Sequence, residues 1–131
     1  MSSIRVLLVD DEEGFTTSMK RILGSRGFDV TVARDGLAAL STLGCDHFDV
    51  IILDVKMPGM DGIHVLSEVS RICPDSRVIM LTGHYALSEE EDALKKGVYA
   101  YLQKPYPILK LVDVLVAAAS KNEHRPCQIK D

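Results

Sequence analysis

Three carboxylates, one hydroxyl and one ammonium lie at the ends of separate apolar runs in this sequence. The carboxylates belong to Asp10, Asp11 and Asp54, the hydroxyl to Thr82 and the ammonium to Lys104. If the runs are parallel strands of one open sheet, their carboxyl ends form the edge where ligands bind in such sheets. We therefore expect these five side chains to converge on one site.

Such a concentration of negative charge requires a cation. Two carboxylates 4 Å apart repel each other by about 4 kcal/mol at an effective dielectric constant near 20. Mg²⁺ relieves this repulsion because it is a hard cation that prefers oxygen ligands and keeps several waters. With Lys104 offsetting one more charge, the carboxylate of Asp54 becomes a candidate acceptor for in-line phosphoryl transfer.

Each of these residues also has a purely structural explanation. Asp10 and Asp11 could cap the helix that follows, and Asp54 could be a cap or turn residue. Thr82 stands in a Thr-Gly turn signal, and a single lysine such as Lys104 is usually solvated. Their joint arrangement at successive strand ends favours the functional interpretation.

Five short runs rich in Val, Ile and Leu predict the strands that position these groups. They span residues 4–9, 28–33, 48–53, 77–81 and 98–102. At least three are apolar nearly throughout, which is typical of parallel strands covered on both faces. Because segments with helical periodicity alternate with them, the sequence predicts an α/β doubly wound parallel sheet of five strands with five helices.

Local signals mark the ends of several expected helices. Asp61 can cap the third helix. We expect this helix to end before Cys73-Pro74, because a proline disfavours helix in the residue before it. Ser88 and Glu91 form a capping box for a short fourth helix that ends near Gly97. Pro107 suits the first turn of the fifth helix.

Size and composition indicate one soluble domain. With 131 residues, of which 47% are hydrophobic and 26% charged, the chain can build one core but not two ordinary domains. We assign residues 1–120 to the folded domain. The polar, unpatterned residues 121–131 are expected to form a tail or the start of a linker.

Charge and cysteine content argue against several other classes. A net charge of −4 without a basic stripe speaks against direct binding of nucleic acid. We recognise no signal peptide, and the apolar runs are far shorter than the roughly 20 residues of a membrane helix. Three widely spaced cysteines fit a reducing compartment and neither a disulfide framework nor a zinc site. We therefore expect a cytoplasmic protein without membrane contact.

Four segments resemble the signature of response-regulator receiver domains, the CheY-like phosphoacceptor half of two-component phosphorelay signalling. They are VLLVDDEE, DVIILDVKMPGMDG, VIMLTGH and AYLQKP. The similarity covers about residues 4–120, and LDVKMPGMDG is its most specific segment. The resemblance implies the flavodoxin-like strand order 2-1-3-4-5. It also implies a regulator that is not an enzyme, apart from catalysing its own phosphorylation and dephosphorylation.

The resemblance further implies that a histidine kinase or a phosphotransfer protein phosphorylates Asp54. Asp11, Asp54 and the backbone carbonyl of Lys56 would bind Mg²⁺ directly, with Mn²⁺ as the alternative metal. Asp10 would act mainly through a metal-bound water.

Other roles follow from the same resemblance. Lys104 would pair with the phosphoryl group, and Thr82 would form a hydrogen bond to it. Tyr101 matches the aromatic switch position, which turns inward when Thr82 moves toward the phosphoryl group. Pro105 follows Lys104 through what is commonly a cis peptide bond.

Two variable positions match those that tune hydrolysis of the phosphoaspartate in this family. They are Lys56, two residues after Asp54, and His84, two residues after Thr82. A cationic Lys56 could pair with a phosphoryl oxygen and obstruct the attacking water, which predicts a slow decay. Alternatively, both side chains point into solvent.

The fourth expected helix has little apolar support, so we expect it to be weakly held. It carries the acids Glu89, Glu90, Glu91 and Asp92, against only Ala93 and Leu94. The resemblance makes the surface of the fourth helix, fifth strand and fifth helix the expected face for a downstream protein or a second copy.

Three other classes fit less well. A haloacid-dehalogenase-type phosphohydrolase has a second Asp where this chain has Lys56, and a flavodoxin-like FMN site needs a phosphate-binding loop where this chain has DDEEG. A degenerate receiver that acts unphosphorylated conflicts with the intact acids, Thr82 and Lys104. The chain could be a stand-alone receiver or a fragment of a longer regulator with a DNA-binding or enzymatic domain.

Overall fold

The computed structural model describes residues 3–55 and 62–120, in which strands and helices alternate. The strands are β1 (Arg5–Val9), β2 (Asp29–Ala33), β3 (Val50–Leu53), β4 (Arg77–Thr82) and β5 (Ala100–Gln103). The helices are α1 (Glu13–Ser25), α2 (Gly36–Leu43), α3 (Gly62–Ile72), α4 (Leu87–Lys95) and α5 (Ile108–Ser120).

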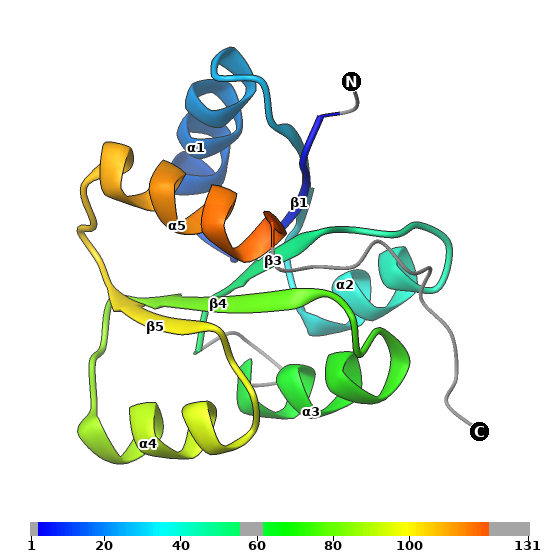
Figure 1. The fold of residues 1–131 in the computed structure, drawn as a ribbon, viewed down its shortest axis with the longest axis vertical. Helices are drawn as coiled ribbons and strands as arrows, with labels where there is room; N and C mark the ends of the chain where they lie inside the picture. Colours follow the sequence, from blue (N-terminus) through cyan, green and yellow to red (C-terminus); the bar gives the residue numbers. More distant parts are fainter. Residues whose placement is uncertain (1–2, 56–61, 121–131) are drawn as a thin grey trace.

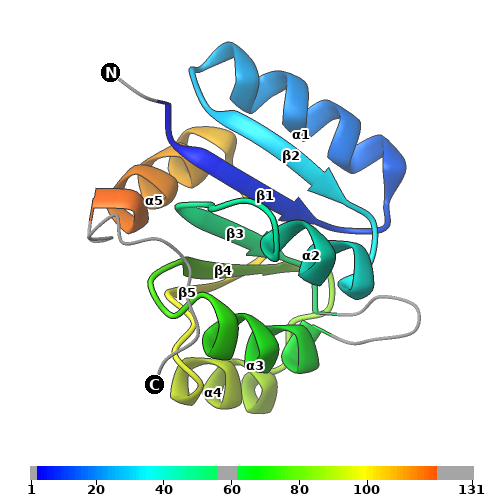
Figure 2. The same ribbon diagram turned by 90° about the vertical axis from the view of Figure 1, so that its right-hand side faces the viewer.

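The five strands form one parallel sheet in the order β2-β1-β3-β4-β5. The sheet lies at the centre of the molecule with helices on both of its faces (Figures 1 and 2). The predicted fold class and strand order are therefore confirmed.

Alternate side chains of β1 divide the core into two layers. Val6 and Leu8 pack with apolar residues of α1 and α5, whereas Leu7 and Val9 pack with those of α2, α3 and α4. Figure 1 shows the same division, with α1 and α5 on one side of the sheet and the other helices below it. Because successive side chains of a strand point to opposite faces, a strand covered on both faces must be apolar throughout.

Several predicted boundaries shift by one or two residues. Phe48 and Asp49 precede β3, although the Asp49 N–H already donates to the Arg5 carbonyl (2.9 Å) and the Asp49 carbonyl accepts from the Arg77 N–H (3.1 Å). Val98 and Tyr99 precede β5, and Thr82 still belongs to β4. The shift at Thr82 matters most, because it places the hydroxyl of this predicted site residue on a strand rather than in a turn.

The predicted capping box of the fourth helix is wrong. The cap of α4 is Ala86, whose backbone is extended and whose side chain can accept no hydrogen bond. Ser88 therefore lies inside the first turn of the helix. The cap predicted at Asp61 lies outside the described residues, whereas Pro107 directly precedes α5 and its carbonyl accepts from the Leu111 N–H at 3.0 Å.

The expectation drawn from the cysteines also needs a correction. Cys73, which is buried just after α3, is disulfide-bonded. Cys45 is free and exposed.

Candidate functional site

Three aspartates meet at the carboxyl ends of the two central strands. Asp10 and Asp11 follow β1 and Asp54 follows β3, whose last residues Val9 and Leu53 are paired in register. The Asp54 N–H continues this ladder by donating to the Val9 carbonyl at 3.0 Å. As a result, one carboxylate oxygen from each aspartate lies within 4.8 Å of the others.

This cluster has the donor chemistry of a site for a hard divalent cation. It offers carboxylate oxygens only, the ligand type that Mg²⁺, Mn²⁺ and Ca²⁺ prefer. Asp10 is buried, with 2% of its surface exposed, while Asp11 is exposed. A bound ion would therefore remain open to solvent on one side. Lys56, whose carbonyl is the remaining expected ligand, lies outside the described residues.

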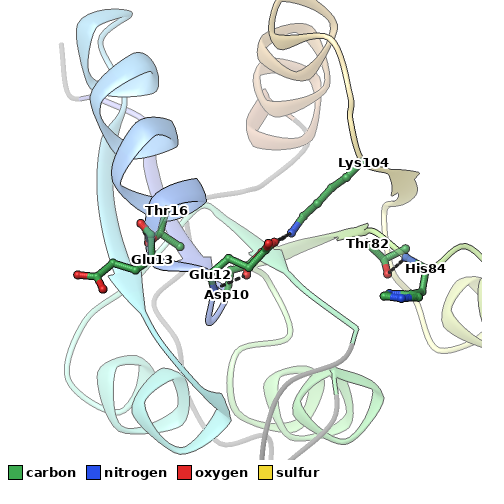
Figure 3. Close-up of polar contacts among 7 residues, drawn as sticks. All are labelled: Asp10, Glu12, Glu13, Thr16, Thr82, His84 and Lys104. Atoms are coloured by element: carbon green, nitrogen blue, oxygen red, sulfur yellow. Dashed lines mark hydrogen bonds and ion pairs between the residues drawn. The ribbon is translucent and has the colours of Figure 1, made fainter.

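Lys104 reaches the same cluster from the end of β5. Its Nζ donates to Oδ2 of Asp10 at 2.7 Å and to Oε1 of Glu12 at 3.0 Å (Figure 3). The ammonium also lies 4.1 Å from the centre of the Phe15 ring, a cation–π contact. The peptide bond between Lys104 and Pro105 is cis.

These neighbours determine the charge state of Lys104. Burial by itself would lower the pKa of its ammonium, because a charge is less stable away from water. Hydrogen bonds to Asp10 and Glu12, together with the negative charges of Asp10 and Asp54, outweigh burial and raise the pKa of Lys104 above its usual value. The lysine is therefore a permanent cation at this end of the sheet.

Thr82 lies beside Lys104 at the end of β4. The Lys104 N–H donates to the Thr82 carbonyl at 2.7 Å, so the backbone ties the two positions together. Thr82 is 1% exposed, and its Oγ1 accepts a hydrogen bond from the His84 N–H at 3.0 Å (Figure 3). His84 itself is exposed.

Tyr101 lies within the core layer formed by α2, α3 and α4. It is 7% exposed, its hydroxyl is 3.4 Å from Oε1 of Glu89, and its ring meets Tyr85 edge to face with centroids 5.8 Å apart. Burial, followed by the charge of Glu89, raises the pKa of Tyr101. The ring is therefore nearly buried in this core layer, next to Glu89 and Tyr85.

Three contacts at the site were not predicted from the sequence. Glu12 and Phe15 both contact the Lys104 ammonium, although neither was among the predicted site residues. The third is Gly62, whose N–H donates to the Val55 carbonyl at 2.6 Å. A Cβ on Gly62 would lie 2.8 Å from the Cα of Val55 and closer still to the Asp54 carbonyl oxygen. A glycine between an acid and a helix is the signal that could have indicated this close approach.

A separate hollow lies at the amino ends of the strands, away from the cluster of Asp10, Asp11 and Asp54. It is lined by the start of β1, the segment before β3 and the end of α5, including Arg5, His47, Asp49 and Ser120. It contains none of the residues expected at the site. No helix in the described part of the chain is long and apolar enough to cross a membrane.

A doubly wound sheet with three acids, a threonine and a lysine at the carboxyl ends of its strands defines the class of α/β receiver modules. The chain belongs to the response regulator receiver domain family, whose sequence model matches residues 6–116. Members of this family are the receivers of two-component signalling and interact with histidine kinases or other proteins.

Individual relatives support this membership. The response regulator MprA of Mycobacterium tuberculosis is 34% identical over 110 residues, which are 84% of this chain and 48% of MprA. The chain thus spans about half the length of the curated relatives it matches.

Solved structures agree with the same family. A CheY-like receiver domain protein from Methanospirillum hungatei has a TM-score of 0.89 and 29% identity, over 93% of this chain and 98% of that one. A response regulator from Burkholderia pseudomallei, solved with a phosphorylated aspartic acid, a calcium ion and citrate, has a TM-score of 0.82 and 29% identity. The match covers 89% of this chain and 69% of the Burkholderia chain.

Proposed function

We propose that Asp54 accepts a phosphoryl group from a histidine kinase or phosphotransfer protein in a Mg²⁺-dependent reaction, and that phosphorylation switches the binding of a partner. The observation that carries the proposal is the cluster of three carboxylates within 4.8 Å, with the Lys104 ammonium bound to one of them. The Burkholderia relative, with its phosphorylated aspartic acid and calcium ion, supports the same chemistry here.

In the proposed reaction, a carboxylate oxygen of Asp54 attacks the phosphorus of a phosphohistidine. A P–O bond forms as the P–N bond breaks, and the leaving imidazole keeps the electron pair. Lys104 binds a phosphoryl oxygen through its charge. Thr82 donates its hydroxyl hydrogen to another oxygen, since its Oγ1 already accepts from the His84 N–H.

The residues around the cluster would hold the metal. Asp11, Asp54 and the Lys56 carbonyl would be direct ligands, and Asp10 would act through a metal-bound water. The ion, Mg²⁺ or Mn²⁺, would neutralise the charge that collects on the phosphoryl oxygens. Without it, three carboxylates would repel an incoming dianion.

Incubation with Mg²⁺ and acetyl phosphate, followed by intact-mass measurement, tests the proposal. We expect a mass gain of one phosphoryl group that is lost in Asp54→Asn and on chelation of the metal with EDTA. Asp46→Asn is the matched control. It also removes a carboxylate, but Asp46 is exposed and precedes the amino end of β3, whereas Asp54 follows its carboxyl end. No gain in the unmodified chain under any metal condition would identify a degenerate receiver that binds partners without phosphorylation.

We propose that Lys56 and His84 set the lifetime of the phosphoaspartate. A cationic side chain at Lys56 would pair with a phosphoryl oxygen and obstruct the attacking water. Lys56→Ala is therefore expected to speed the loss of phosphate measured by intact mass after the donor is removed. An unchanged decay rate would show that this side chain points into solvent.

We propose that the output passes through the face formed by α4, β5 and α5, to a downstream protein or a second copy. Leu87 and Leu94 support this assignment, because they lie two turns apart on α4 and are 60% and 48% exposed. Tyr101 would couple this face to the site. The acidic net charge supports a protein partner rather than direct contact with nucleic acid.

We further propose that residues 1–120 form the receiver and residues 121–131 a tail or linker. The domain would work in the cytoplasm and catalyse only its own phosphorylation and dephosphorylation. It would act alone or as part of a longer regulator with a DNA-binding or enzymatic domain, and the length of the complete gene distinguishes these two arrangements.

A further inference from the structure

Glu12 makes a contact with the site that the proposed phosphoryl transfer does not use. It is the N-cap of α1, yet its side chain forms no capping hydrogen bond with that helix. Its backbone is fixed at both ends, because its N–H donates to Oδ1 of Asp10 at 3.0 Å and its carbonyl accepts from the Thr16 N–H at 3.0 Å. The carboxylate is therefore held within reach of Lys104.

Three groups restrain the Lys104 ammonium. The Asp10 carboxylate is 2.7 Å away, the Glu12 carboxylate 3.0 Å, and the Phe15 ring centre 4.1 Å. Figure 3 shows the Lys104 side chain extended from the end of β5 across to Asp10 and Glu12. Two of the three protons of the ammonium are thus already donated to carboxylates.

We infer that Glu12 is a positioning residue that holds the Lys104 ammonium beside Asp10 and competes with the phosphoryl group for it. This inference rests on the proposed function. The Asp10 contact is buried, but the Glu12 side chain is 65% exposed, so its hold on the lysine is weak and reversible. Glu12 therefore lowers the affinity of the site for a phosphoryl group without closing it.

The removal of Glu12 leaves the lysine restrained. Asp10 and the Phe15 ring still hold the ammonium in Glu12→Gln, so the variant loses the competitor while the cation stays in the site. Glu13→Gln is the matched control. It removes the same charge from the next residue, whose carboxylate pairs with Arg34 at 3.1 Å instead of with Lys104.

Beryllofluoride, an inorganic phosphoryl analogue, tests the inference when it is titrated into the chain with Mg²⁺. We expect Glu12→Gln to bind it about two- to fivefold more tightly than the unmodified chain, the range of coupling measured for exposed ion pairs. Glu13→Gln should bind as the unmodified chain does. Equal tightening in both variants, or none in Glu12→Gln, would overturn the role of Glu12.

A second measurement separates the contact with Lys104 from a general effect of charge. Initial rates of phosphorylation by acetyl phosphate are compared in Lys104→Met and in the double variant with Glu12→Gln. If Glu12→Gln no longer changes the phosphorylation rate in the Lys104→Met background, the inference is supported. If it still changes that rate, the inference is contradicted. If the unmodified chain binds no beryllofluoride and gains no phosphate, the proposed function fails, and the inference fails with it.

Discussion

At the scale of single residues, Gly62 shows how closely α3 packs against the acceptor strand. Its N–H donates to the Val55 carbonyl, and the space where a Cβ would lie is filled by backbone atoms of Asp54 and Val55. Backbone atoms cannot rotate away as the end of a flexible side chain can. Any larger residue must therefore shift α3 or the segment that carries Asp54.

We expect Gly62→Ala to destabilise the fold by about 1–3 kcal/mol, the usual cost of overpacking. Urea unfolding monitored by circular dichroism measures the change. Gly24→Ala is the matched control, because Gly24 lies in α1 with nothing within 4 Å of its Cβ position. That control should stabilise the fold by about 0.5–1 kcal/mol, since glycine is unfavourable inside a helix. Equal effects of the two substitutions would contradict the close approach at Gly62.

The sequence could place the five polar residues of the candidate site at or next to strand ends, but it could not predict their contacts. Asp10, Asp54 and Thr82 were found because each ends an apolar run, and the carboxyl ends of parallel strands meet at one edge. The contact of Lys104 with Glu12 and Phe15 depends on how α1 leaves the sheet and on the side-chain rotamers. Neither of these leaves a periodic signal in the sequence.

At the scale of elements, α4 is the least anchored helix on its side of the sheet. Ala93 is its one buried residue, although the structure describes every residue of the helix. By comparison, α3 buries Gly62, Val65, Leu66 and Val69. The sequence predicted this weakness, but it counted Leu94 as support, whereas Leu94 is 48% exposed. The start of α4 was mispredicted because an S-x-x-E pattern also occurs inside a first turn.

We expect backbone amides of α4 to exchange hydrogen faster than those of α3, because few buried contacts hold α4 in place. Hydrogen exchange followed by mass spectrometry of peptides from each helix measures the difference. Equal protection of the two helices would contradict the weak anchoring of α4.

Tyr101 is the expected link between the site and α4. Its hydroxyl lies near Glu89 of α4 and its ring meets Tyr85, which precedes the helix. In Tyr101→Ala we expect phosphorylation of Asp54 to stay nearly intact. The change in α4 exchange on phosphorylation, and the phosphorylation-dependent binding of a partner, should both weaken. A full exchange response in this variant would exclude Tyr101 as the coupling residue.

At the scale of the whole molecule, the two core layers explain why the fold was predictable. Helices cover both faces of the sheet, so the central strands are apolar nearly throughout and are easy to recognise. Strand ends were less predictable: Asp49 already forms backbone hydrogen bonds to Arg5 and Arg77, yet the regular strand begins only at Val50. The disulfide at Cys73 could not be predicted, because spacing along the chain says little about proximity in space.

The contact between Asp10 and Lys104 joins residues that are 94 positions apart. A ribosome that has just completed β1 must still synthesise most of the chain before the lysine emerges. Until then, the acids of the first strand have no such counter-charge. A nascent or truncated chain that stops before β5 therefore lacks the ammonium that pairs with Asp10. Topology alone thus makes completion of this site depend on synthesis of the last strand.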